Sequence, residues 1–311
     1  MKQDMPSFAW AVGGGKGGVG KSWISLGLAY WFGRLGRDVV IMDGDLGGAN
    51  LHTMLGIRIP GRTLDDFLLR KVETLDEILI PTNLSRVKLI AGGSELPSLA
   101  NPNYAQKTRV VRAMKSLPTD VMLVDLGAGI GLNTLDFFLA CPNKMVVITP
   151  QPTSIQNAYG FIKAALFRKI SRIITPTPLK GLLDARPNDE QPPPSSIEEI
   201  LEEVSISAPE VLDEVRQAVD DLRIRLIVNM SANSRDVKAG NVIQGVCRRF
   251  LSVEVEILGS VPRDSRVERW SATMDPGSLV TQDPDNGALK SLYEIAYALL
   301  RDIPTLEKNA A

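Results

Sequence analysis

Cysteine is scarce in this sequence of 311 residues, and no sign of charge is in excess. The two cysteines, Cys141 and Cys247, lie far apart in the chain, which excludes a disulfide scaffold and a local CxxC metal site. Lysine and arginine total 35 against 36 aspartate and glutamate, and the net charge of −1 argues against a protein whose whole surface binds a polyanion. No apolar run reaches the roughly 20 residues that a membrane-spanning helix requires.

The first residues also lack the pattern of a secretion signal, because Asp4 and Pro6 precede only a short apolar run. We therefore expect a cytoplasmic protein. The length suits one α/β unit of about 250 residues with an insertion. We expect residues 1–311 to form a single domain.

Short runs rich in valine, isoleucine and leucine alternate with helical patterns, which is typical of repeated βα units around a parallel sheet. Several runs are apolar throughout, as expected of strands covered on both faces. The pattern therefore predicts a doubly wound α/β fold with a mostly parallel sheet. The predicted strands are Phe8–Val12, Asp38–Asp43, Arg86–Ala91, Asp120–Asp125, Lys144–Thr149, Arg223–Met230 and Val253–Leu258. The predicted helices are Lys21–Leu35, Asn103–Ser116, Thr153–Ile174, Ser234–Phe250 and Gly287–Arg301.

One segment, at about 175–222, interrupts this alternation. Three consecutive prolines at 192–194 indicate a stiff linker. Residues 197–222 contain nine acidic residues and one basic residue, Arg216, with apolar positions spaced for two helices. We expect an acidic helical insertion, which is either a solvated decoration or a surface for a partner.

The stretch before this insertion is basic. Between Ser154 and Leu183 there is no acid, and five lysines and arginines occur: Lys163, Arg168, Lys169, Arg172 and Lys180. Such a surface suits lipid or nucleic acid, and it equally suits the acidic segment that follows it. We expect the internal pairing, and leave DNA binding open.

A glycine-rich loop, GGGKGGVGKS at 13–22, lies between a predicted strand and a predicted helix. Its Gly15, Gly20, Lys21 and Ser22 satisfy the phosphate-loop spacing GxxxxGK[ST]. Glycines let backbone N–H groups converge on phosphate oxygens, Lys21 would neutralise the β and γ phosphates, and Ser22 would ligate Mg²⁺. The residues expected around the phosphates are Gly15, Lys16, Gly17, Gly18, Val19, Gly20, Lys21 and Ser22.

Three aspartates end predicted strands. Asp43 and Asp45 follow the second strand and Asp125 ends another. Side chains at the carboxyl ends of parallel strands face the crevice in which a nucleotide binds, although an acid there can also cap a helix. Mg²⁺ keeps several waters and takes one or two carboxylates beside the phosphates. We expect Ser22, Asp43 and Asp125 to hold the metal.

These motifs resemble those of a known family. KGGVGKS resembles the deviant Walker A sequence of the MinD/ParA ATPases, and DGDLGGANLHTMLG resembles their DxDxGxxNLxxxLG block. TPQPTSIQNAYGFIK at 149–163 resembles the FlhG (FleN) branch of flagellar-number regulators. The resemblance implies a P-loop NTPase fold of the SIMIBI type.

The resemblance also implies site roles. Lys16 would reach across an ATP-bound homodimer to the partner's nucleotide, and Asp45 would orient or deprotonate the attacking water. Asp43 would hold the water shell of Mg²⁺, and Asp125 would be the Walker B acid. Gly127 and Gly129 would belong to the switch that senses the γ phosphate.

Further positions follow from the same resemblance. In LIVNM and ILGSVPRD, it implies that Asn229, Pro262 and Arg263 contact adenine, although an asparagine at a strand end is often only a turn former. Asn50 matches a residue near the dimer interface. His52, the only histidine, stands where many relatives have aspartate, and is either a surface residue or a catalytic one.

The implied function is a slow regulatory ATPase that uses ATP and Mg²⁺ to switch between monomer and homodimer. It would regulate the place or number of a flagellum, a division site or a similar polar complex through an unidentified protein partner. The alternatives are an iron–sulfur carrier, which needs paired cysteines, and a small-molecule kinase, which needs an acceptor pocket. We expect no iron–sulfur cluster. The tail RDIPTLEKNAA lacks the basic amphipathic pattern of a membrane helix, so we expect none there.

Overall fold

The computed structural model describes residues 8–93, 102–183, 194, 196–233, 235–273 and 286–301. For residues 270–273 it describes the backbone but not the side chains. Its strands are β1 (Ala9–Gly13), β2 (Val39–Asp43), β3 (Leu79–Pro81), β4 (Val87–Ile90), β5 (Val121–Asp125), β6 (Asn143–Ile148), β7 (Ile224–Ser231) and β8 (Val255–Pro262). They form one eight-stranded sheet in the order β3-β4-β2-β5-β1-β6-β7-β8. Only β3 pairs antiparallel, with β4, so the predicted mostly parallel sheet is confirmed.

Helices follow most strands. They are α1 (Lys21–Arg34), α2 (Leu51–Met54), α3 (Leu64–Leu68), α4 (Tyr104–Met114), α5 (Leu132–Ala140), α6 (Pro152–Ile174), α7 (Ile197–Ser207), α8 (Leu212–Asp220), α9 (Lys238–Leu251), α10 (Ser265–Thr273) and α12 (Gly287–Arg301). None of the helices in the described ranges is long and apolar enough to cross a membrane.

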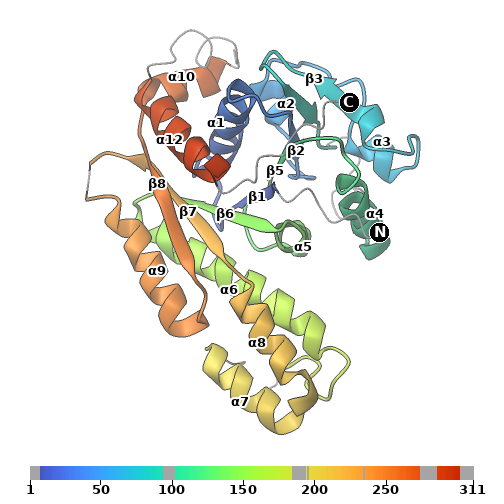
Figure 1. The fold of residues 1–311 in the computed structure, drawn as a ribbon, viewed down its shortest axis with the longest axis vertical. Helices are drawn as coiled ribbons and strands as arrows, with labels where there is room; N and C mark the ends of the chain where they lie inside the picture. Colours follow the sequence, from blue (N-terminus) through green and yellow to red (C-terminus); the bar gives the residue numbers. More distant parts are fainter. Residues whose placement is uncertain are drawn as a thin grey trace.

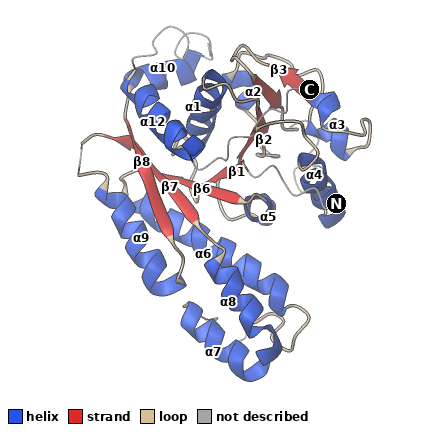
Figure 2. Ribbon diagram, viewed as in Figure 1, coloured by secondary structure: helices blue, strands red, loops and turns tan. Residues whose placement is uncertain are grey.

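The central strands are buried on both faces. In β1, Ala9 and Ala11 face one apolar core, whereas Trp10 and Val12 face another, because successive side chains of a strand point to opposite faces. Helices α1 and α12 pack in the core that holds Trp10, and helices α4, α5, α6 and α9 pack in the other. Figure 2 shows the strands between these two helical layers.

The chain leaves β1 in one direction to build β2 and β4, and later extends the sheet from β6 in the other direction. Open α/β sheets bind ligands at the carboxyl ends of the strands where the order reverses in this way. The loop after β1 therefore lies at the position expected of a ligand site.

Helix α6 extends beyond the sheet and carries the two helices of the acidic segment (Figure 1). These are α7 and α8, as the apolar spacing predicted. Val215 and Val219 of α8 are buried in the same core as Ile170 of α6. The acidic residues remain on the outside, since an amphipathic helix buries only its apolar stripe.

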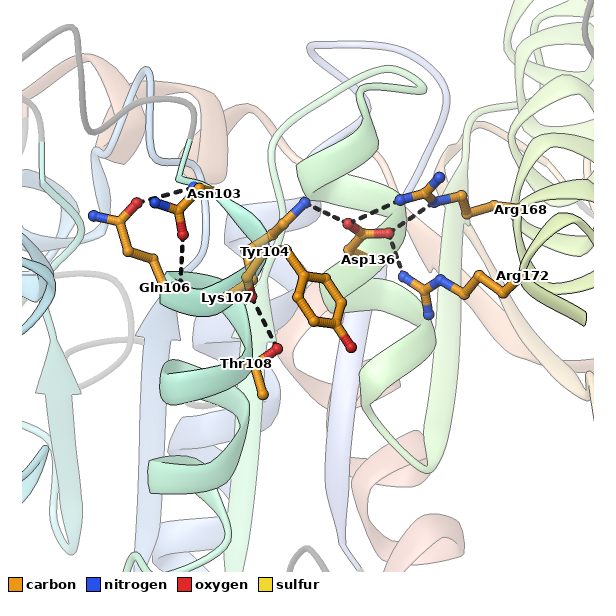
Figure 3. A network of polar contacts seen from close by, with 8 residues as sticks. All are labelled: Asn103, Tyr104, Gln106, Lys107, Thr108, Asp136, Arg168 and Arg172. Atoms are coloured by element: carbon orange, nitrogen blue, oxygen red, sulfur yellow. Dashed lines mark hydrogen bonds and ion pairs between the residues drawn. The ribbon is translucent and has the colours of Figure 1, made fainter. Parts of the chain in front are cut away.

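The expected pairing of the basic stretch with the acidic segment is only partly right. Lys169 donates to the Ala218 carbonyl at 2.9 Å and lies 3.9 Å from the Asp221 carboxylate. Arg168 and Arg172, however, pair with Asp136 of α5 (Figure 3). Asp136 is buried, and a buried carboxylate is costly unless it is paired with cations. Pairing with Asp136 therefore stabilises the fold more than pairing with the exposed acids of the insertion would.

Lys107 of α4 binds the same carboxylate, so Asp136 joins three helices, α4, α5 and α6. Burial alone would raise the pKa of Asp136, but the bonds from Arg168 and Lys107 and the charge of Arg172 outweigh it and hold this pKa below its usual value.

Several short elements were not predicted, namely β3, α2, α3, α5 and α10. Strand β8 also runs four residues past its expected end at Leu258, to Pro262, and α9 begins at Lys238, four residues after the expected start at Ser234. Some predictions concern positions outside the described residues: Asp4, Pro6, the prolines at 192 and 193, Ser234 and the C-terminal tail.

Candidate functional site

The glycine-rich loop connects β1 directly to α1, as the sequence predicted. Gly18 and Gly20 have φ of 76° and 87°, in the left-handed region that favours glycine. A Cβ on Gly20 would lie 2.2 Å from Nδ2 of Asn229. Glycine is therefore required at position 20 both by the backbone and by the approach of β7.

Lys21, the first residue of α1, is only 8% exposed. Its ammonium group donates to the Lys16 carbonyl at 3.4 Å, which is a weak contact for a buried cation. Burial lowers the pKa of Lys21, and the charges of Asp125 and Asp45 oppose that effect. A buried cation of this kind gains strongly from a phosphate group brought next to it.

A cavity of about 370 Å³ opens in front of this lysine. Its lining brings together six of the residues predicted around the phosphates and the metal: Gly17, Gly18, Gly20, Lys21, Ser22 and Asp125. Asp45, predicted to act on the attacking water, and Asn50, predicted near the dimer interface, also line it. Of the predicted catalytic and metal-binding residues, Ser22, Asp45 and Asp125 therefore meet in one place, whereas Lys16 and Asp43 are not part of this lining. We call this cavity the phosphate compartment.

Asp125 lies at the end of β5 and is 3% exposed. Ser25 donates to its Oδ1 at 3.0 Å, and Ser22 also hydrogen-bonds to it. Burial raises the pKa of Asp125 to about 7, with a further rise from Asp43, while the two serines and Lys21 favour the charged form. A divalent cation beside this carboxylate would favour its deprotonation.

Asp43 fixes the loop that follows β2. Its Oδ2 accepts the backbone N–H groups of Asn50 and Leu51, at 2.8 and 2.9 Å, and its Oδ1 accepts that of Asp45 at 3.1 Å. Burial raises the pKa of Asp43 to about 6, even though these three backbone bonds favour the charged form. The carboxylate thus caps α2 and shapes the loop, a role that the sequence left as an alternative to metal binding.

Asp45 is partly exposed and lines the mouth of the phosphate compartment. A Cβ on Gly127 would lie 2.9 Å from its carboxyl group, so Asp45 packs directly on the loop after β5. The loops after β2 and β5 are therefore in contact.

The carboxylates do not form a metal cage by themselves. Across the described ranges, no three histidine, cysteine, aspartate or glutamate side chains are placed to hold an ion together. Mg²⁺ in nucleotide sites is bound by one or two carboxylates with waters and phosphate oxygens. The neighbouring Ser22 and Asp125, beside a glycine cradle for phosphate, fit that kind of site.

Lys16 points away from the phosphate compartment of its own chain. Its ammonium group donates to Oγ1 of Thr153, at the start of α6, at 3.2 Å. A Cβ on Gly15 would lie 2.0 Å from the Asn157 carbonyl oxygen, so α6 packs tightly against this part of the loop. Neither Lys16 nor Thr153 lines the phosphate compartment.

A second cavity, of about 100 Å³, adjoins the first and is lined by the three predicted adenine contacts, Asn229, Pro262 and Arg263. We call it the base compartment. Asn229 is buried and donates from Nδ2 to the Val19 carbonyl at 2.8 Å, so it also supports the phosphate loop. The backbone N–H of Arg263 donates to the Ser231 carbonyl, and its guanidinium pairs with Glu268.

Several contributors to the site were not predicted, among them Ser25, Thr153, Trp23, Met54 and Met230. Trp23 and Met230 line both compartments. Ser25 follows Lys21 by one helical turn, a spacing that would have indicated it. Asn50, predicted near a dimer interface, lines the phosphate compartment. His52, whose role the sequence left open, lies on α2, where burial lowers its pKa.

Comparisons with known proteins bear on the family and the fold. The model of the ParA family, described as NUBPL iron-transfer P-loop NTPase, matches residues 7–174. The antiactivator FleN of Pseudomonas aeruginosa is 37% identical over 155 residues, which are 49% of this chain and 54% of FleN. The flagellum site-determining protein YlxH of Helicobacter pylori is 35% identical over 164 residues, covering 49% of this chain and 52% of YlxH.

The chain thus matches about half the length of these two relatives. Among solved structures, the septum site-determining protein MinD of Pyrococcus horikoshii, complexed with Mg-ADP, superposes with a TM-score of 0.63 at 18% identity. That match covers 94% of this chain and 95% of the other. It supports the fold over nearly the whole length.

Proposed function

Because this chain belongs to the ParA family of P-loop NTPases, we propose that it is a Mg²⁺-dependent ATPase that dimerises on binding ATP and separates after hydrolysis. The phosphates would lie on the loop 13–22, with Lys21 beside the β and γ phosphates. Ser22, Asp43 and Asp125 would organise the metal. When bound, Mg²⁺ supplies positive charge that offsets the charge of the phosphate oxygens.

The observation that carries this proposal is the position of Lys16. The ammonium group of Lys16 donates to Thr153, which lies outside the compartment that Lys21 lines. Lys16 and Lys21 nevertheless belong to the same loop. We propose that from this position Lys16 would enter the site of a second copy. Delivered in this way, it would stabilise the charge that develops during phosphoryl transfer only in the dimer.

The loops after β2 and β5 would supply the rest of the switch. Asp45 would hold the attacking water at the mouth of the compartment and accept its proton. Because Asp45 packs on Gly127, a γ phosphate that orders one loop would order the other. Asp43 holds the first of these loops through three backbone bonds, so it sets the position of Asp45.

The biological role is proposed from the relatives. FleN is an antiactivator and YlxH is a flagellum site-determining protein. We infer that this chain regulates the place or number of a flagellum, a division site or a similar complex. It would do so in the cytoplasm, together with an unidentified protein partner.

Iron transfer is the second candidate, because the description of the family model names it. The two cysteines of the sequence offer poor support for it. Cys141 and Cys247 are 1% and 0% exposed, and burial raises the pKa of each thiol to about 12. Buried thiols of this kind are poor metal ligands, since a metal binds the thiolate.

Replacing Lys16 with alanine tests the proposal. Hydrolysis should fall by about 100-fold or more, as when a cation supplied in trans is removed, while ATP affinity stays unchanged. The wild-type rate per molecule should also rise with protein concentration, because the active species is a dimer. The measurement is phosphate release over a range of protein concentrations, together with calorimetric ATP binding.

Lys71→Ala is the matched control, since Lys71 is a surface lysine whose side chain is 63% exposed. It should hydrolyse ATP at the wild-type rate. A Lys16→Ala variant with full activity, and a wild-type rate independent of concentration, would show that Lys16 does not act in trans.

A further inference from the structure

Met230, near the end of β7, has a backbone conformation that is unusual for its residue type. Its φ is 58°, in the left-handed region, where a side chain with a Cβ is sterically disfavoured. Three other non-glycine residues of the described ranges share this feature: Arg70, Arg86 and Ser252. Of the four, Met230 is the one that lines the compartments described above. Conformations of this kind cluster at functional sites, where the fold holds them in place.

The pairing of β7 with β8 explains how this conformation arises. Asn229 pairs with Val261 and Ser231 with Pro262, so the register shifts at Met230. Neighbouring residues of a regular strand point to opposite faces, and an irregularity of this kind redirects a side chain. As a result, Asn229 and Met230 both line the base compartment.

The side chain of Met230 lies where the two compartments meet. It lines both of them, and its Cε lies 3.6 Å from the position that a Cβ on Gly20 would occupy. Asn229 beside it is 2% exposed, whereas Met230 remains 37% exposed. The thioether is therefore an accessible apolar group beside the phosphate loop, on the side of the base compartment.

The chemistry of the two compartments differs. The phosphate compartment presents Lys21, Ser22, Asp45 and Asp125. The lining of the base compartment includes the charged residues Arg263, Asp264 and Glu268, but it also has apolar walls, Pro262 and Val267, that the phosphate compartment lacks. A ligand that spans them has a polyanionic end and a flat apolar end. Thioether groups pack favourably against aromatic rings, which suits Met230 to the second of these ends.

We propose that Met230 is a specificity-determining residue that packs against the purine and ribose of the bound nucleotide and favours purine over pyrimidine nucleotides. The inference rests on the proposed nucleotide binding and adds to it the group that selects the base. The larger purine ring covers more of the thioether than a pyrimidine does, and affinity follows the apolar area that is buried.

The test measures by calorimetry the binding of ATP, CTP and inorganic tripolyphosphate to wild type and to Met230→Ala. Wild type should bind ATP more tightly than CTP. Met230→Ala should bind ATP about tenfold more weakly, which corresponds to about 1.4 kcal/mol, and tripolyphosphate as wild type does. The ratio of ATP to CTP affinity should fall accordingly.

Two further variants separate this role from a structural one. Asparagine tolerates the left-handed conformation, so Met230→Asn should keep the wild-type melting temperature and still lose ATP affinity. Met54 lines only the phosphate compartment. Met54→Ala should therefore change the affinities for ATP and tripolyphosphate by the same factor and leave the ratio of ATP to CTP affinity as in wild type.

Unchanged ATP affinity in Met230→Ala would overturn the inference while leaving the proposed function intact. An equal loss for ATP and tripolyphosphate would also overturn it, since Met230 would then act on the phosphate loop. Wild type that binds tripolyphosphate but no nucleoside triphosphate would overturn the proposed function together with this inference.

Discussion

Replacing Lys21 with alanine is expected to abolish nucleotide binding, with a loss of affinity of more than about 100-fold. Lys21 is 8% exposed, and the nearby charges that act on its ammonium group are those of Asp125 and Asp45. Phosphates placed on the loop would meet a cation already stripped of water, so the attraction is strong. Without Lys21, the same phosphates would face the two carboxylates alone, and repulsion would add to the loss.

The folded protein should not suffer from this change. Burial lowers the pKa of Lys21, which means that the desolvation of this cation destabilises the folded protein when no ligand is bound. The Lys21→Ala melting temperature without ligand should therefore be equal to or above that of wild type. Calorimetric titration with ATP and thermal unfolding check both expectations. Wild-type ATP affinity in this variant would remove the phosphate-loop assignment.

Replacing Asp136 with alanine is expected to destabilise the fold by about 3–5 kcal/mol, the range for breaking a buried ion pair from one side. Asp136 is 8% exposed and binds Lys107, Arg168 and Arg172, with Nε of Arg168 at 2.9 Å (Figure 3). Its loss leaves three cations close together without their shared anion, and removes the ionic link between α4, α5 and α6.

Denaturant unfolding of the apo protein measures this effect. Asp213→Ala is the control, because Asp213 also pairs with an arginine, Arg216, but its side chain is 98% exposed. Exposed pairs contribute less than about 1 kcal/mol. If Asp136→Ala and Asp213→Ala unfold at the same denaturant concentration, the cluster is not a structural centre of the fold.

The long elements were predictable because their signals are local. Helix α12 begins and ends at the predicted residues, Gly287 and Arg301, because an apolar stripe runs along it. Strand β3 has three residues and ends at Pro81, so it has neither the length nor the alternation of a strand signal. Helix α5 is only nine residues long and begins soon after the glycines that follow β5. A short apolar run in that position does not distinguish a helix from a strand or a loop.

The site residues likewise fall into a group with a local signal in the sequence and a group without one. The phosphate loop and the aspartates were predicted because their spacing in the chain is itself the motif. The partners that hold them come from distant parts of the sequence. Thr153 lies 137 residues from Lys16 in the sequence. Arg168 pairs with Asp136 and not with the acidic segment that follows α6 in the sequence. Contacts of this kind depend on the packing of α5 and α6, which no local pattern encodes.

The most direct test of the ATP-dependent switch is light scattering after size exclusion, on wild type and Asp45→Ala with Mg·ATP and with Mg·ADP. We expect a dimer with ATP and a monomer with ADP. Asp45→Ala should accumulate the ATP dimer, because the carboxylate that we propose holds the attacking water would be missing. A monomer in every condition, in protein that still binds ATP, would contradict the switch.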